Sequence, residues 1–179
     1  MSIIKIIQIA LLACGSLAFI IYSWRYLTNP RVHGFYRFFG WEVSLLLVIF
    51  NLPVWFNDPF APIQIVSWVL LILSIILAMV GFILLGKRGK PRGSFEDTTT
   101  IVSTGLYRYI RHPLYASLIL FTLGTGLKNP DLLSLVLTLA ATLFYYLTAK
   151  VEEEEILVKF GENYREYMKR TKLFIPFIF

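Results

Sequence analysis

Residues 105–115 read Gly-Leu-Tyr-Arg-Tyr-Ile-Arg-His-Pro-Leu-Tyr and place two arginines, a histidine and three tyrosines at the start of an apolar segment. About forty residues later, the acidic run Glu152, Glu153, Glu154 and Glu155 closes the next apolar segment. Arginines at a helix N-terminus favour a carboxylate or phosphate, whereas carboxylates and aromatic faces favour a sulfonium or ammonium. If the two segments form an antiparallel hairpin, the two polar clusters meet and suit a zwitterionic ligand with an apolar arm.

The composition is that of an integral membrane protein. Apolar residues make up 57% of the 179 residues and charged residues only 16%, and several apolar runs approach the ~20 residues that a bilayer span requires. We expect an all-α integral membrane fold with about five transmembrane helices, of which the second and fourth are short. The expected segments are residues 3–27, 41–56, 63–86, 113–127 and 132–151.

The basic residues predict how these segments cross the membrane. Fifteen of the 17 Lys and Arg residues fall on one side of the five segments, leaving Lys5 and Lys128 on the other. Because Lys and Arg concentrate near the cytoplasmic ends of spans, the N-terminus is predicted outside and the C-terminus in the cytoplasm. The net charge of +6 then reflects a basic face against anionic lipid, so no nucleic-acid partner is expected.

Residues 1–179 are expected to form a single membrane domain with three parts. Residues 1–86 hold three transmembrane helices. Residues 87–104 are a cytoplasmic loop rich in Gly, Pro and charged residues. We interpret this loop as a linker, and the alternative is a lid over a site. Residues 105–179 form a helical hairpin and C-terminal segment that would hold a cofactor. After the acidic run, Ile156, Leu157 and Phe160 recur at helical spacing and predict a cytoplasmic amphipathic helix.

Local signals place the polar residues of the hairpin. Pro113 suits the first turn of a helix, which puts His112 near the N-cap and Arg111 just before it. Arg108 is expected to reach the membrane interface by snorkelling. His33 lies in a segment read as a basic loop, where no role is expected for it.

In order and spacing, these motifs resemble the isoprenylcysteine carboxyl methyltransferase and phospholipid methyltransferase family of integral membrane enzymes. The resemblance covers about residues 101–176. It rests on Gly105, Tyr107, Arg111, His112, Pro113, Tyr115, a Glu-Glu pair, Phe160, Gly161, Tyr164, Tyr167 and Pro176.

The resemblance implies S-adenosylmethionine as cofactor and a lipid or lipidated acceptor that reaches the site from the bilayer. It implies that His112, Tyr115 and one or both of Glu152 and Glu153 contact the cofactor. We add Tyr107 and Pro113 to the cofactor site, and we name Arg111, His112 and Glu153 as the candidate catalytic residues. The family often has an arginine a few residues before the final proline, but Leu173 stands at that spacing here. A prenylcysteine carboxylate acceptor is therefore less well supported.

Other chemistries are left open or disfavoured. A carboxylate acceptor needs no base, whereas an amine acceptor must lose a proton, for which His112 or a glutamate is a candidate. Two alternatives remain: an NADPH-dependent reductase similar to the sterol reductases, and a non-catalytic lipid-binding module. The sequence has no Gly-x-Gly-x-x-Gly motif and no metal-ligand cluster, so neither a soluble-type nucleotide fold nor a metal is expected.

Overall fold

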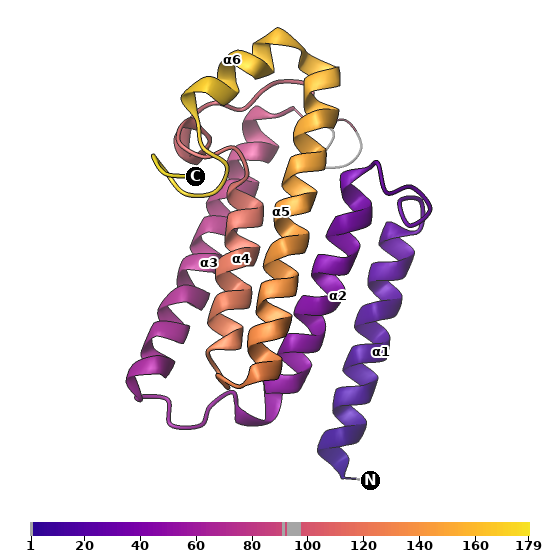
Figure 1. The fold of residues 1–179 in the computed structure, drawn as a ribbon, viewed down its shortest axis with the longest axis vertical. Helices are drawn as coiled ribbons and strands as arrows, with labels where there is room; N and C mark the ends of the chain where they lie inside the picture. Colours follow the sequence, from indigo (N-terminus) through magenta and orange to yellow (C-terminus); the bar gives the residue numbers. More distant parts are fainter. Residues whose placement is uncertain (1, 91, 93–97) are drawn as a thin grey trace.

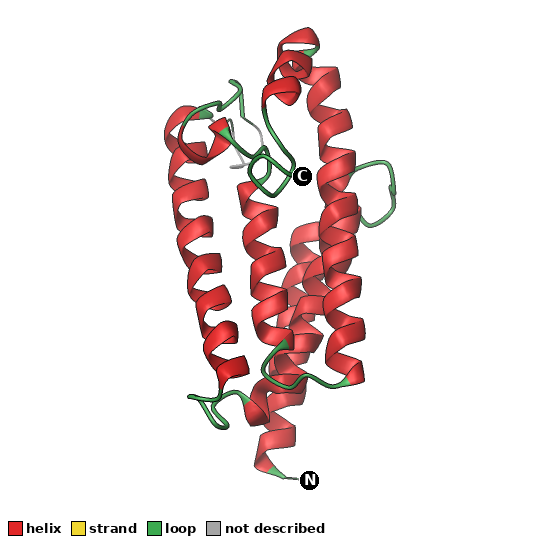
Figure 2. Ribbon diagram, turned by 60° about the vertical axis from the view of Figure 1, so that its left-hand side comes forward, coloured by secondary structure: helices red, strands yellow, loops and turns green. Residues whose placement is uncertain are grey.

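The computed structural model describes residues 2–90, 92 and 98–179. Within these residues the fold contains helices and loops and no β-strand (Figure 2), as expected for an all-α membrane protein. The helices are α1 (Ile3–Ser23), α2 (His33–Asn51), α3 (Pro62–Arg88), α4 (Pro113–Gly126), α5 (Leu132–Phe160) and α6 (Glu162–Arg170), with short 3-10 helices η1 (Leu52–Val54) and η2 (Gly105–Arg108).

The helices α1 to α5 run roughly parallel and form the bundle, and α6 crosses one end of it (Figure 1). The helices α1, α2 with η1, α3 and α5 are long and apolar enough to span a bilayer. The shorter α4, at 14 residues, measures roughly 21 Å and falls short of a ~30 Å hydrocarbon core. The protein is therefore a multi-pass membrane protein, and its described residues hold four candidate spans and one shorter apolar helix.

The ends of the helices follow from local sequence. Pro62 and Pro113 occupy first-turn positions of α3 and α4, where a missing N–H costs nothing. The Asp131 carboxylate caps α5 by accepting a hydrogen bond from the Ser134 backbone N–H at 2.7 Å. Gly161, with φ +55°, makes the turn from α5 into α6, a conformation that glycine adopts without strain.

The acidic run continues α5 without a break to Phe160, so a single helix joins the membrane-spanning part to the acidic cluster. At the opposite end of the bundle, buried polar side chains tie the helices together. Asn51 donates to the Thr125 carbonyl and to the Ser134 hydroxyl, and Ser67 donates to the Gly124 carbonyl. Such interhelical bonds are a common way of joining helices in lipid, where apolar burial gives little driving force.

The second helix begins earlier than the sequence predicted. We placed its apolar segment at residues 41–56, but α2 starts at His33 and so includes Arg37. The expectation that His33 lies in a loop is wrong. Its backbone N–H and its imidazole Nδ1 each lie 2.7 Å from a carboxylate oxygen of Glu155, which ties the start of α2 to α5.

Close packing between α2 and α5 depends on Gly40. Tyr145 is fully buried, and its hydroxyl lies 3.1 Å from the Gly40 carbonyl and 2.7 Å from the Ser44 hydroxyl. A Cβ at position 40 would stand 2.7 Å from a Tyr145 ring carbon. The two helices therefore approach at a distance that only glycine allows.

We predict that Gly40→Ala destabilises the protein by about 1–3 kcal/mol because the Tyr145 ring must move. Gly86→Ala is the matched control, since Gly86 is also helical and a Cβ there meets nothing within 4 Å. Thermal unfolding in detergent measures both. Equal melting temperatures for the two variants would contradict the close-packing argument.

Candidate active site

The two polar clusters predicted from the sequence meet at the end of the bundle that carries α6. The Arg111 Nε donates to a Glu153 carboxylate oxygen at 2.5 Å. The His112 ring lies 3.7 Å from Glu152 through Nδ1 and 3.8 Å from Glu153 through Nε2. The start of α4 and the acidic part of α5 are therefore adjacent, as the antiparallel hairpin requires.

The C-terminal segment completes this arrangement by pairing with the chain just before α4. The backbone N–H groups of Arg111 and His112 donate to the carbonyls of Lys172 and Leu173 at 2.8 and 3.2 Å. The Lys172 N–H donates back to the Tyr109 carbonyl at 2.9 Å. This short parallel bridge holds the segment after α6 against the start of α4 and fixes the direction in which residues 111 and 112 point.

Arg111 joins three parts of the chain. Besides the pair with Glu153, its Nη1 donates to the Thr171 carbonyl at 2.6 Å and to the Met168 carbonyl at 3.3 Å. Its predicted catalytic role is not tested by these contacts. Through these contacts the guanidinium links the start of α4 to α5 and to the end of α6.

Glu153 is 1% exposed and carries two cationic partners, Arg111 and the Lys150 Nζ at 3.1 Å. It is not among the residues that line the neighbouring cavity, whereas Glu152 is. The sequence could not decide which glutamates of the run face a ligand. The structure turns Glu152 toward the cavity and Glu153 toward Arg111.

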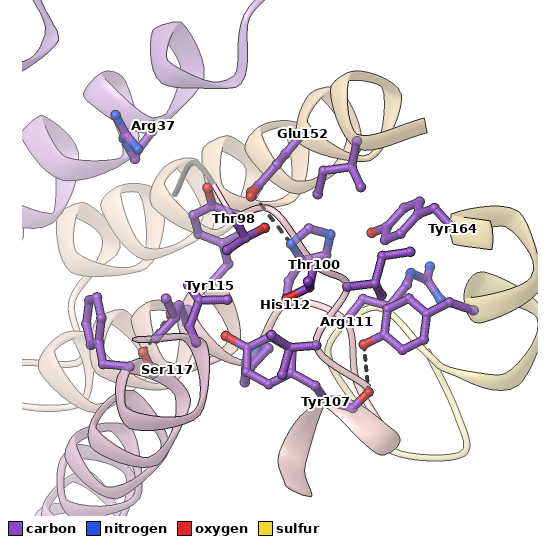
Figure 3. Close-up of a pocket in the computed structure, with 18 of the residues that line it drawn as sticks. Arg37, Thr98, Thr100, Tyr107, Arg111, His112, Tyr115, Ser117, Glu152 and Tyr164 are labelled. Carbon is purple, nitrogen blue, oxygen red and sulfur yellow. Dashed lines mark hydrogen bonds and ion pairs between the residues drawn. The ribbon is translucent and has the colours of Figure 1, made fainter. Parts of the chain in front are cut away.

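The cavity has a volume of about 270 Å³, near the lower end of the ~300–1,000 Å³ typical of small-molecule sites. Figure 3 shows Tyr107, His112, Tyr115, Glu152 and Tyr164 around it. Every predicted cofactor residue except Glu153 lines it. Further lining residues come from α2, α3 and the loop before η2, and were not predicted: Arg37, Trp41, Ala78, Phe82, Leu85, Thr98, Thr100, Ile101 and Val102.

Aromatic residues form much of the cavity wall. The His112 ring stacks on Tyr115, with centroids 5.6 Å apart and an angle of 24° between the planes. Tyr167 donates its hydroxyl to the Tyr107 carbonyl at 2.6 Å and so ties α6 to η2. Burial raises the pKa of Tyr107, Tyr164 and Tyr167, so all three phenols stay neutral at physiological pH.

The loop before η2 forms one side of the cavity and does not merely connect helices. Thr98 and Thr100 line the cavity, and the Thr100 hydroxyl donates to the Arg88 carbonyl at 2.7 Å. The Thr99 N–H donates to the Gly89 carbonyl at 2.9 Å. Residues 91 and 93–97 of the predicted loop lie outside the described residues. The contacts with the cavity therefore concern the part of the loop after residue 97.

His112 and Glu152 line the cavity, and each has a buried polar atom without a hydrogen-bond partner in the described part of the chain. Nε2 of His112 lies 3.8 Å from Glu153, and Oε2 of Glu152 lies 3.7 Å from Nδ1 of His112, both beyond hydrogen-bond distance. Buried polar atoms are nearly always hydrogen-bonded. A polar ligand in the cavity would satisfy both, and this favours a binding site over a purely structural cluster.

The sequence of this chain is similar to that of known proteins. Residues 63–163 match the family model described as "Phospholipid methyltransferase". The chain belongs to this family. The match contains α4, the acidic run and the cavity residues of α3, but it ends before most of α6 and excludes α1 and α2.

Curated relatives carry two kinds of name. The protein-S-isoprenylcysteine O-methyltransferase of Xenopus laevis is 38% identical to this chain over 86 residues, and that of Homo sapiens is 38% identical over 87 residues. The cobalt-zinc-cadmium resistance protein CzcN of Cupriavidus metallidurans is 37% identical over 84 residues. Each match covers 46% of this chain but only 29%, 30% and 38% of the respective relative.

We predict that Glu153→Gln destabilises the fold by about 2–5 kcal/mol, because Arg111 would lose its buried counter-charge. Glu154→Gln, an exposed neighbour in the same run, should leave the melting temperature within about 1 °C of wild type. Thermal unfolding of the purified variants is the measurement. A Glu153→Gln protein of wild-type stability would contradict the stabilising role of the pair with Arg111.

Proposed function

We propose that this protein transfers a methyl group from S-adenosylmethionine to a lipid or lipid-modified acceptor in the cavity beside α4 and α5. The observation that carries the proposal is the pair of unsatisfied polar atoms on His112 and Glu152 within an aromatic cavity. Family membership supports the same reaction class. The relatives named as O-methyltransferases support it further.

The cavity residues fit a cofactor that is zwitterionic and carries a sulfonium. Glu152 supplies a carboxylate for an ammonium group, and Tyr107, Tyr115 and Tyr164 offer ring faces to a sulfonium, each good contact contributing ~0.5–2 kcal/mol. The N-terminus of α4 has no side-chain cap, and its first residues Pro113 and Leu114 line the cavity. Its partial positive charge suits the carboxylate of an amino-acid moiety.

For methyl transfer the protein mainly has to position the cofactor and the acceptor and to exclude water. The bound cofactor supplies a methyl group already activated by the sulfonium. His112 and Glu152 hold the polar end of the ligand, and the aromatic wall excludes water from the line of transfer. We assign Arg111 and Glu153 a positioning role, since each touches the other and neither needs to reach the reacting atoms.

The acceptor lies on the apolar side of the cavity. Ala78 and Phe82 of α3 and Leu118 of α4 line this side, and α3 is a candidate span, so a lipid chain is accommodated from the bilayer. A carboxylate acceptor needs no base there. An amine acceptor would give its proton to His112, which is buried in the cavity wall. With the basic helix ends facing the cytoplasm, the reaction takes place at the cytoplasmic leaflet.

The first test is a thermal-shift and calorimetric titration of purified protein with S-adenosylhomocysteine and, separately, NADPH. Stabilisation by S-adenosylhomocysteine alone is expected. Stabilisation by NADPH alone would support a reductase instead. No response to either would support a non-catalytic lipid-binding module.

The second test concerns the carboxylate. Glu152→Gln should weaken S-adenosylhomocysteine binding at least tenfold, because it removes the negative charge that faces the ligand's ammonium. Glu154→Gln, the exposed control, should stay within twofold of wild type. Equal affinities in the two variants would refute the assignment of Glu152, even if wild-type binding is tight.

A further inference from the structure

A separate pocket lies between α5 and the segment that follows α6. Its volume is about 320 Å³. Tyr146 and Lys150 of α5 line it together with Lys172 and Phe179 of the C-terminal segment. None of these four residues lines the cavity described above, and Arg111 is the lining residue that the two spaces share. The proposed methyl transfer makes no use of this space, which we call the C-terminal pocket.

The C-terminal pocket carries more positive than negative charge. Arg111 and Lys150 share one counter-charge, because both bond to the carboxylate of Glu153. The Lys172 side chain is exposed and has no hydrogen-bond or ion-pair partner in the described part of the chain. The described residues that line the pocket include no acidic side chain. An anion placed between the two lysines would balance this charge.

The ammonium groups are the donors that remain for such an anion. The Arg111 guanidinium already donates to Glu153 and to the backbone carbonyls of Met168 and Thr171. Lys150 makes one bond, to Glu153 at 3.1 Å, and an ammonium carries more donors than this bond uses. Lys150 and Lys172 can therefore both donate to an anion in the pocket.

The position of Lys150 along α5 corresponds to the depth of lipid headgroups. Helix α5 is a candidate span that begins at Leu132. At about 1.5 Å per residue, the rise from Leu132 to Lys150 is roughly 27 Å, which is close to the ~30 Å thickness of the hydrocarbon core. Lys150 then lies at the boundary between acyl chains and headgroups, and the ring of Tyr146 lies one turn deeper.

Exposed apolar side chains adjoin the pocket. Phe177 is 80% exposed and Ile178 is 75% exposed. Figures 1 and 2 both show the C-terminus on the bundle side of α6, near the height at which α4 begins. The Phe179 ring stacks on Tyr146 with centroids 6.1 Å apart, which holds this segment against α5. At the membrane boundary such apolar side chains contact acyl chains.

We infer that the C-terminal pocket binds the phosphate group of an anionic phospholipid through the ammonium groups of Lys150 and Lys172. Basic pockets at the ends of membrane helices commonly bind such headgroups. The lipid is a structural ligand and not the methyl acceptor, since it binds outside the cavity proposed for methyl transfer. It joins α5 to the segment whose carbonyls accept the backbone N–H groups of Arg111 and His112. The inference goes beyond the proposed function and does not depend on it.

The experiment measures binding of three probes to the full chain in detergent by calorimetry. They are dihexanoylphosphatidylglycerol, which is anionic, dihexanoylphosphatidylcholine, which is zwitterionic, and inorganic phosphate. Wild-type protein should bind the phosphatidylglycerol at least about tenfold more tightly than the phosphatidylcholine, because two lysines face its charge. Inorganic phosphate should bind more weakly than phosphatidylglycerol, because it has no acyl chains to contact the apolar side chains beside the pocket.

Variants then assign this preference to the pocket. Lys172→Gln and Lys150→Gln should each weaken phosphatidylglycerol binding roughly fivefold. Lys87→Gln is the matched control, since Lys87 is an exposed lysine at the same end of the bundle that does not line the pocket. It should bind the lipid as wild type does. Lys172→Gln should keep wild-type affinity for S-adenosylhomocysteine, because Lys172 does not line the cavity.

Thermal unfolding tests the structural effect of the lipid. Phosphatidylglycerol should raise the melting temperature of wild-type protein more than that of Lys172→Gln at the same lipid concentration, because a ligand that binds the folded state stabilises it in proportion to its affinity. Equal increases in the two proteins would contradict a stabilising role of the bound headgroup.

Several binding results would overturn the inference. Equal affinities of wild type for the two lipids would exclude recognition by charge. An equal loss in Lys87→Gln and Lys172→Gln would assign the preference to the general surface charge, and inorganic phosphate binding as tightly as the lipid would make free phosphate the ligand. If Lys150→Gln does not fold, the exposed Lys172 decides alone. Absence of S-adenosylhomocysteine binding, with the lysine-dependent preference intact, would refute the proposed function alone.

Discussion

The site depends on one buried ion pair, between Arg111 and Glu153. The pair joins the start of α4 to the acidic part of α5, and the same guanidinium also bonds carbonyls at and after the end of α6. A buried charge that loses its partner is strongly unfavourable, so these three parts of the chain are held in one arrangement. That arrangement turns Glu152 and His112 toward the cavity (Figure 3) and places Tyr164 and Tyr167 of α6 among the residues that line it.

The cavity lies beyond the N-terminus of the short helix α4. Because α4 begins at Pro113, well short of the ends of α3 and α5 on that side of the bundle (Figure 1), side chains of both neighbours face the space beyond its N-terminus. The loop before η2 and the C-terminal segment fill the outer part of this space with backbone hydrogen bonds. What is left is lined by aromatic rings, a few polar atoms and apolar side chains of α3.

Much of the fold could be predicted from the sequence, because bilayer spans and helix starts carry strong local signals. Pro113, the acidic run and the basic helix ends were sufficient to predict the hairpin and the meeting of its polar ends. Which glutamate faces the cavity and which faces Arg111 could not be predicted. Adjacent residues on a helix point about 100° apart, and in a run of four glutamates the sequence does not show which one faces the neighbouring helix. Arg37 was missed because the segment before residue 41 was read as a loop. A helix start at His33 would have shown an arginine inside a span.

The most direct measurement is an experimental structure of the protein with S-adenosylhomocysteine. Ligand density between α4, α5 and α6, with its amino group within hydrogen-bond distance of Glu152, is the predicted result. Ligand density instead in a separate pocket, lined by Lys150, Lys172 and Phe179, with packed side chains around Glu152, would contradict the site.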